Sequence, residues 1–193
     1  MSSLERFSLV TEVVSIDRGR NRKWGLMSGK KMTGKHLKDY HGYKHLSSDA
    51  THDYYEKHHT RGQERSHDSS NYIAHNKATK QIDIHVSGKK NRAGTFHIHT
   101  LSAAKDSGKK AHDFYHHLIR KHNIALSTDK QSTGGRNVWE KLRKKRGINI
   151  HGWDPKTKKP VNVHSGDDEA YHHEKSKDKS DGSKRLHLIA HKR

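Results

Sequence analysis

Alternating apolar and polar residues predict a β-hairpin in the middle of the chain. Ile82, Ile84 and Val86 fall on one side of residues 81–86, with polar residues between them, which is the pattern of a half-buried strand. A Gly-containing turn follows, and the alternation resumes over residues 95–101. Two such strands separated by a short turn are expected to pair with each other.

Two later segments change from this two-residue period to the 3.6-residue period of a helix. Residues 111–121 carry a full apolar stripe, and residues 136–145 carry a shorter one before Gly147. The stripe residues are expected to face the core. They are Ala111, Phe114, Tyr115, Leu118 and Ile119 in the first helix, and Val138, Trp139 and Leu142 in the second.

Shorter apolar runs predict further strands, at residues 7–16, 124–127, 148–153 and 161–163. One or two short helices are expected within residues 17–70, with residues 51–59 as a candidate place. Residues 185–191 fit either a final strand or a frayed tail. The order strand, strand, helix, strand, helix, strand, strand predicts an α/β (α+β) fold, with a mixed sheet flanked by helices.

Composition divides the chain into three parts. Residues 1–70 form a basic, His-rich and partly irregular N-terminal extension, which is expected to become ordered in part only on a partner. Residues 71–164 hold the α/β core. Residues 165–193 form a polar linker and C-terminal tail with little to bury.

The charge of the chain indicates its partners. The 193 residues include 40 Lys and Arg against 21 Asp and Glu, so the formal net charge is +19 at pH 7. Such a surplus is typical of proteins that contact a polyanion, although it also favours solubility. Because the basic clusters are spread along the chain, we expect non-specific contacts with nucleic-acid phosphates or another polyanion.

Several classes of protein are excluded by what the chain lacks. It has no Cys, which removes disulfides, thiolate metal sites and Cys nucleophiles. No segment approaches the ~20 apolar residues of a membrane-spanning helix. The first residues lack the basic-then-apolar order of a secretory signal peptide. We therefore expect no membrane contact and no secretion by that route.

The loop before the first predicted helix is a candidate anion site. It runs from Lys105 to Lys110 and contains Gly108. A helix start presents unpaired N–H groups and the positive end of the helix dipole, and a glycine lets the backbone approach an anion closely. The same composition also serves helix capping and solubility, so the loop fits a pyrophosphate without requiring one.

Residues 72–163 resemble the central and C-terminal parts of the GNAT (Gcn5-related N-acetyltransferase) superfamily. The resemblance rests on the predicted hairpin, the loop, the helix and the short strand, followed by QSTGGRNVWEKL at residues 131–142. The longer stretch STDKQSTGGRNVWEKL, with INIHGWD after it, is similar to GNAT-like proteins of tailed bacteriophages. This implies an acyl-CoA-dependent N-acyltransferase of phage origin, found in the host cytoplasm or in the virion.

The resemblance also implies a cofactor site. In this superfamily the strand and the following loop hold acyl-CoA, and backbone amides of an Arg/Gln-x-x-Gly-x-Gly/Ala pattern contact its pyrophosphate. Gly108 fits this pattern, while Lys105 and Lys110 depart from it. The residues expected to bind acetyl-CoA or another acyl-CoA are Lys105, Ser107, Gly108, Lys109, Lys110 and Ala111.

The catalytic positions depart from the family pattern. Many members carry a Tyr in the later helix as general acid, whereas Trp139 stands at this place. No Glu occupies the usual place of the general base. Asp83, His97 and His99 are the candidate catalytic residues, with His85 as a further substitute, and imidazole has the more suitable ordinary pKa. The alternative for each is a solvent-facing strand residue.

Three alternatives remain beside acyl transfer. The His pairs at helical spacing are as frequent as 21 His would give by chance, and no carboxylate completes a zinc signature, so no metal site is expected. His58-His59-Thr60 and His85-Val86-Ser87 fit the H-x-T/S pair of two-histidine phosphoesterases. A basic virion or nucleic-acid-associated structural protein with a GNAT-like fold, bound to virion proteins, is the non-enzymatic alternative.

Overall fold

In the computed structural model, the described residues are 31–39, 41–59, 69–91, 93–104, 107–128, 133–154, 157–163 and 187–193. The strand expected at residues 7–16 lies outside them. The strands are β1 Lys44–Ser48, β2 His52–His59, β3 Ser69–Asn76, β4 Ile82–Lys90, β5 Phe96–Ala103, β6 Leu126–Thr128, β7 Ile148–Asp154, β8 Lys159–Val161 and β9 His187–Lys192. The helices are α1 Gly34–Asp39, α2 Ala111–His122 and α3 Thr133–Arg143.

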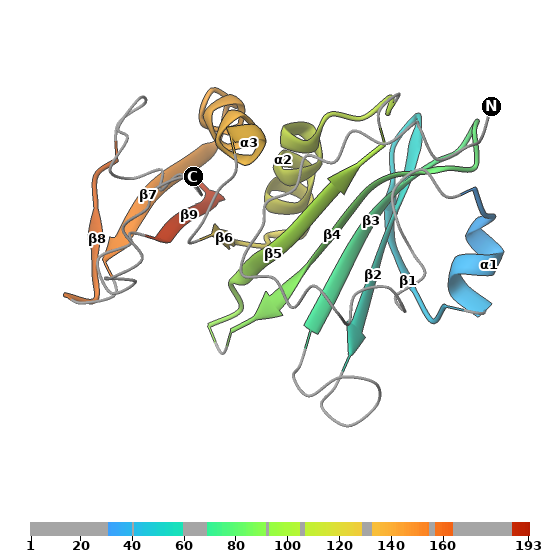
Figure 1. The fold of residues 1–193 in the computed structure, drawn as a ribbon, viewed down its shortest axis with the longest axis horizontal. Helices are drawn as coiled ribbons and strands as arrows, with labels where there is room; N and C mark the ends of the chain where they lie inside the picture. Colours follow the sequence, from blue (N-terminus) through green and yellow to red (C-terminus); the bar gives the residue numbers. More distant parts are fainter. Residues whose placement is uncertain are drawn as a thin grey trace.

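These strands form one mixed sheet in the order β1-β2-β3-β4-β5-β6-β9-β7-β8 (Figure 1). Every neighbouring pair is antiparallel except β5 and β6, which are parallel. The expectation of an α/β fold with a mixed sheet is therefore confirmed. No helix within the described ranges is long and apolar enough to cross a membrane.

The first half of the sheet begins earlier in the chain than the sequence pattern indicates. Strands β1 and β2 pair with each other and with β3, so the sheet continues through residues 44–59 of the expected N-terminal extension. A short helix within residues 17–70 is confirmed by α1, but its expected place near residues 51–59 is wrong, because this segment is β2. Tyr54 and Tyr55 are adjacent and both buried. They can both be buried because successive strand residues point to opposite faces of the sheet, and each face is covered.

Strand β9 lies inside the second half of the sheet. It pairs with β6 on one side and with β7 on the other, and β8 lies beyond β7. Leu188 and Ala190 are buried on the same side of β9. Of the two expectations for residues 185–191, the strand is therefore confirmed.

Helices α2 and α3 lie side by side over one face of the sheet (Figure 1). The stripe residues expected in the core are buried, apart from Ala111, which packs half-buried against the core. Helix α3 begins at Thr133 and ends at Arg143, slightly before the predicted 136–145. The main core therefore lies between these two helices and the sheet.

A smaller core covers the opposite face near α1. It consists of Met32, Leu37, Tyr43, Tyr55, Ile73 and Ile82. Ile82 was expected to share a face with Ile84 and Val86, which belong to the main core, and this expectation is wrong. The pairing of β3 with β4 shifts register between Ala74 and His75, and such a β-bulge reverses the side to which the following residues point.

Candidate functional site

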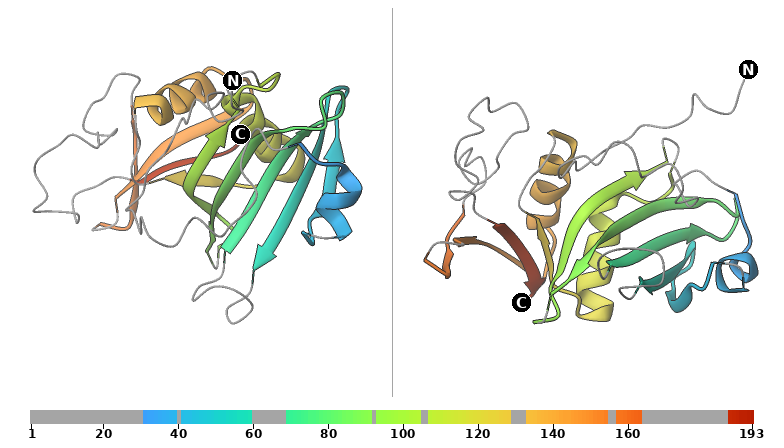
Figure 2. Two further views of the ribbon diagram at one scale, coloured as in Figure 1. Left: turned by 45° about the vertical axis from the view of Figure 1, so that its right-hand side comes forward. Right: turned by 60° about the horizontal axis from the view of Figure 1, so that its bottom comes forward.

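The two halves of the sheet meet at the short parallel pair of β5 and β6. Pairing covers only Phe96 with Leu126 and His97 with Ser127, although β5 continues to Ala103. Helix α2 is the crossover connection that parallel neighbours require. Beyond His97, the edge of β5 toward β6 has no strand partner among the described residues. Figure 2 shows the two halves of the sheet running at different angles on either side of this junction.

A β-bulge in β5 lies next to the junction. The pairing of β4 with β5 shifts register between Ser87 and Gly88, and His99 is the extra residue of β5. The bulge places Ile98 and Leu101, which are three residues apart, in the same core. A bulge of this kind changes where a strand's side chains point and ends its regular pairing, and here it does so beside the place where the sheet divides.

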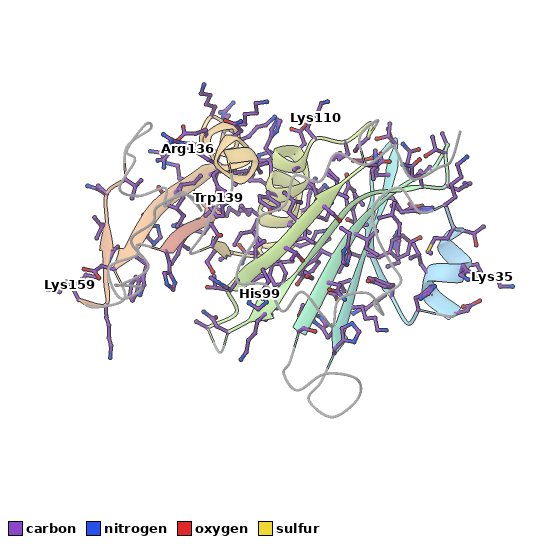
Figure 3. The ribbon with its side chains drawn as sticks, in the orientation of Figure 1. Lys35, His99, Lys110, Arg136, Trp139 and Lys159 are labelled. Atoms are coloured by element: carbon purple, nitrogen blue, oxygen red, sulfur yellow. The ribbon has the colours of Figure 1, made fainter. Side chains whose placement is uncertain are left out.

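Histidines gather at this junction on the face opposite α2 and α3. The ring centroid of His97 lies 5.5 Å from that of His99 and 5.8 Å from that of His187, the first residue of β9. The Nδ1 atom of His97 is 3.1 Å from the Ser127 hydroxyl. His97 is half-buried, and His99, which Figure 3 labels, is exposed. The structure therefore brings two of the three predicted catalytic residues together.

Asp83, the third predicted catalytic residue, lies elsewhere. It stands at the bulge between β3 and β4 and is buried, at 2% exposure. Its carboxylate accepts hydrogen bonds from Nε2 of His52 at 2.7 Å and from the Asn76 side-chain amide at 3.2 Å. The alternative of a solvent-facing Asp83 is wrong, because the bulge turns the side chain inward. Its hydrogen bonds make Asp83 a structural carboxylate rather than a neighbour of His97.

The loop expected to hold a pyrophosphate connects β5 to α2. Its Lys105 lies outside the described residues. The Ser107 hydroxyl accepts a hydrogen bond from the Lys109 amide at 3.1 Å and donates one to the Lys109 carbonyl at 2.6 Å. Gly108 is exposed. The loop is therefore held by its own side chain and leaves Gly108 accessible.

Helix α2 begins after this loop without a side-chain cap. Lys110 is its N-cap residue and is exposed. The N–H groups of Asp113 and Phe114 bond to the Lys110 carbonyl, but those of Ala111 and His112 have no hydrogen-bond partner within the described part of the chain. Unpaired amides at a helix start are donors for an anion.

The ammonium group of Lys109 is already paired. It donates a hydrogen bond to Asp49 at 3.0 Å and lies 5.3 Å from the centre of the Tyr54 ring. Burial acts to raise the pKa of Asp49, but hydrogen bonds from Tyr54, from the backbone amides of Thr51 and His52, and from Lys109 outweigh it and hold that pKa well below its usual range. The ionised Asp49 therefore fixes Lys109, and with it the loop, against β2.

A pocket of about 370 Å³ opens beside the loop, along the outer face of α2. Gly108 and Lys109 line it together with Asp113, His117, Arg120 and Lys121. Burial, with smaller contributions from His122 and Lys109, lowers the pKa of His117 to about 4. Near neutral pH Lys109, Arg120 and Lys121 outweigh the ionised Asp113 in this lining, and His117 is neutral.

Trp139 lies in the core. It is fully buried, and its ring meets that of Tyr115 edge-on at 6.3 Å. It therefore holds α3 against α2, as the apolar stripe predicts.

The other chemistries considered from the sequence find little support in the geometry. No group of three or more His, Asp or Glu side chains in the described part of the chain is placed to hold a metal ion. Of the two H-x-T/S tripeptides, His58 and His59 lie on β2 and His85 lies on β4, with β3 between them. Thr60 lies outside the described residues.

Sequence reasoning missed two parts of this region. His187 has no predicted role, since residues 185–191 fit either a strand or a tail, yet pairing of β9 with β6 brings it to His97. Asp49 was not singled out, although it anchors Lys109. The alternation over residues 187–190 was a signal for the strand. Its position beside β6, however, depends on long-range pairing that no local pattern encodes.

Comparison of the chain with protein-family models, with curated proteins and with solved structures finds no match.

Proposed function

We propose that the protein is an acyl-CoA-dependent N-acyltransferase of phage origin with a GNAT-like fold. The observation that carries this proposal is the parallel pair of β5 and β6, which is joined by α2 and separates after His97. The sequence resemblance implies that acyl-CoA is held by the strand and loop before this helix. In this chain they are β5 and residues 104–110.

The free edge of β5 suits the extended arm of acyl-CoA. Residues 98–103 are paired with β4 on one side and have no strand partner on the other among the described residues. Backbone N–H and C=O groups on such an edge can bond an extended chain that carries amides. The pantetheine arm of acyl-CoA is a chain of this kind, so it fits between the diverging strands.

The start of α2 suits the phosphates. The amides of Ala111 and His112, which no described residue bonds, coincide with the positive end of a 12-residue helix. Lys121 adds positive charge along the adjacent pocket. Of the predicted cofactor residues, Gly108 and Ala111 are assigned to backbone contacts, and Lys109 is assigned to holding the loop through Asp49.

The histidine cluster supplies the acid–base chemistry. Acyl-CoA provides the acyl group as a thioester, and an amine forms the new C–N bond as the C–S bond breaks. His97 or His99 takes the proton from the attacking amine, and Ser127 positions His97. Because Trp139 is fully buried, solvent returns the proton to the departing thiolate.

A second candidate function rests on the charge. The net charge of +19 and the burial of Trp139 at the place of the family's general acid favour a non-enzymatic protein. Such a protein would be a basic virion or nucleic-acid-associated component that associates with virion proteins and keeps the fold without the reaction.

Thermal unfolding with acetyl-CoA tests the proposed function. Millimolar acetyl-CoA should raise the melting temperature, because a ligand at 100 times its Kd stabilises the folded state by about 2.7 kcal/mol. Gly108→Val should abolish this shift by blocking approach to the backbone. Gly108→Ala is the control, because a Cβ at this position would lie at ordinary contact distances, 3.6 Å from Asn76 and 3.8 Å from Asp83.

Catalysis is tested separately with the double variant His97→Ala/His99→Ala. It should keep the acetyl-CoA shift and lose acyl transfer to an amine. A wild-type melting temperature that acetyl-CoA leaves unmoved would refute the cofactor site and favour the non-enzymatic candidate.

A further inference from the structure

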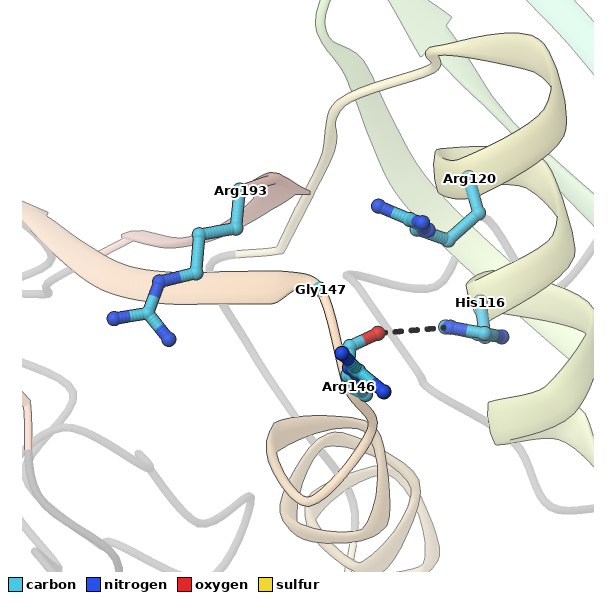
Figure 4. A pocket seen from close by; sticks show the side chains of 5 residues that line it. All are labelled: His116, Arg120, Arg146, Gly147 and Arg193. Atoms are coloured by element: carbon cyan, nitrogen blue, oxygen red, sulfur yellow. Dashed lines mark hydrogen bonds between the residues drawn. The ribbon is translucent and has the colours of Figure 1, made fainter.

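A second pocket on α2 is lined by arginines from three separate elements. It has a volume of about 510 Å³ and lies between α2, the turn before β7 and the end of β9 (Figure 4). His116 and Arg120 come from α2, Arg146 and Gly147 come from the turn, and Arg193 follows β9. No carboxylate side chain is among these lining residues.

The backbone holds these elements together. The Arg193 amide donates a hydrogen bond to the Gly147 carbonyl at 3.0 Å, and Nε2 of His116 lies 3.3 Å from the Arg146 carbonyl. Gly147 has a φ of +78°, and a Cβ there would lie 2.7 Å from a guanidinium nitrogen of Arg120. A glycine therefore lets the Arg120 guanidinium lie against the bare turn.

The positive charge in this pocket is not paired by any side chain within the described ranges. The guanidinium groups of Arg120, Arg146 and Arg193 make no ion pair or hydrogen bond with any residue that the structure describes. Asp113, one turn before His116 on α2, is already paired with Lys145 at 2.6 Å. An anion could therefore bind these guanidinium groups without displacing a side chain of the described residues.

We propose that this pocket binds phosphates of a nucleic-acid backbone. Guanidinium groups match phosphate oxygens in charge and in hydrogen-bond geometry. All three arginines are exposed, and exposed ion pairs contribute little one by one, so a lone phosphate would be held weakly. A strand with successive phosphates also gains from counterion release, and the net charge of +19 favours its approach.

This pocket shares His116 and Arg120 with the pocket beside Gly108, so the two substitutions that test it are placed at its other arginines. Arg146 and Arg193 do not line the pocket beside Gly108, and neither is assigned to acyl-CoA or to the histidine cluster. Because the contacts go to phosphates, binding should depend little on base sequence.

The test compares two double variants that each remove two positive charges. Arg146→Gln/Arg193→Gln alters the pocket. Lys35→Gln/Lys159→Gln is the control, because both lysines are exposed and lie at opposite ends of the molecule, away from the pocket (Figure 3). Binding of full-length protein to a short mixed-sequence DNA duplex is measured by fluorescence anisotropy as salt is varied.

The pocket variant should bind about tenfold more weakly, and its log Kd should depend less steeply on log salt, by about 1.8, since each neutralised phosphate contributes about 0.9. The control should stay close to wild type. Equal losses in the two variants would overturn the proposal, because only net charge would then matter. Pocket-dependent binding of inorganic polyphosphate without binding of DNA would overturn nucleic acid as the ligand. Equal melting temperatures of the three proteins establish that both variants are folded.

Discussion

At the residue scale, two buried tyrosines of the main core differ in the hydrogen bonding of their hydroxyl groups. The hydroxyl of Tyr54 donates a hydrogen bond to the ionised Asp49. The hydroxyl of Tyr72 is buried without a hydrogen-bond partner among the described residues. Burial, with a smaller effect of Glu56, raises the pKa of Tyr72 to about 12. The hydroxyl of Tyr72 therefore contributes a desolvation penalty with no hydrogen bond to offset it.

Removing each hydroxyl should affect stability in opposite ways. Tyr72→Phe should leave the free energy of unfolding unchanged or raise it by about 1 kcal/mol, because an unsatisfied buried group is lost. Tyr54→Phe should lower it by about 1.5 to 3 kcal/mol, because a hydrogen bond to a charged group is lost. Urea denaturation measures both. A larger loss in Tyr72→Phe than in Tyr54→Phe would show that Tyr72 has a partner after all.

At the element scale, α2 packs the main core against the sheet. Phe114 is fully buried, and its ring stacks on that of Tyr54 at a centroid distance of 5.9 Å. Phe114→Ala should therefore lower the free energy of unfolding by about 3 to 5 kcal/mol. Lys121→Ala, at an exposed position of the same helix, should change it by less than about 0.5 kcal/mol. Similar effects of the two changes, again by urea denaturation, would mean that the buried face is misassigned.

The helices and the hairpin could be predicted from sequence because the residue pattern that indicates each element lies within that element. The 3.6-residue stripe of α2 and the alternation in β4 and β5 arise within a single element. The helix prediction at residues 51–59 was wrong because Tyr54 and Tyr55 are both buried, in two different cores, so the segment lacks the alternation of a half-buried strand. The bulges at Asp83 and His99 depend on the register with a neighbouring strand. Without them, the burial of Asp83 could not be foreseen, and the grouping of His97 with His187 depends likewise on the long-range pairing of β9 with β6.

At the scale of the whole molecule, low pH should destabilise the folded state by protonating several partly buried histidines. Burial is the largest cause that lowers the pKa of His112, His117, His122 and His151. His117 stacks on Tyr54 at 3.8 Å and lies 3.0 Å from the Ser47 hydroxyl. Folding therefore favours the neutral form of each of these four histidines.

Stability should therefore fall as the pH falls. For His117 the folded pKa of about 4 lies below the ordinary value of 6.5, so between these values the unfolded chain binds more protons, and the free energy of unfolding decreases toward acid. His117→Phe keeps an aromatic ring against Tyr54 and should flatten this decrease. Urea denaturation at several pH values measures it. An unchanged pH dependence would remove His117 as a contributor.

The place of β9 also has a consequence for folding during synthesis. A ribosome releases β6 and β7 well before residues 187–192, yet among the described residues β9 is the strand that joins them. Until then each exposes an unpaired edge, and such edges invite pairing with other chains. The half formed by β1 to β5 needs no later residue for its pairing. We therefore expect β1 to β5 to pair early in synthesis, as segments made first tend to fold first. The second half of the sheet should stay incompletely paired until β9 has been synthesised.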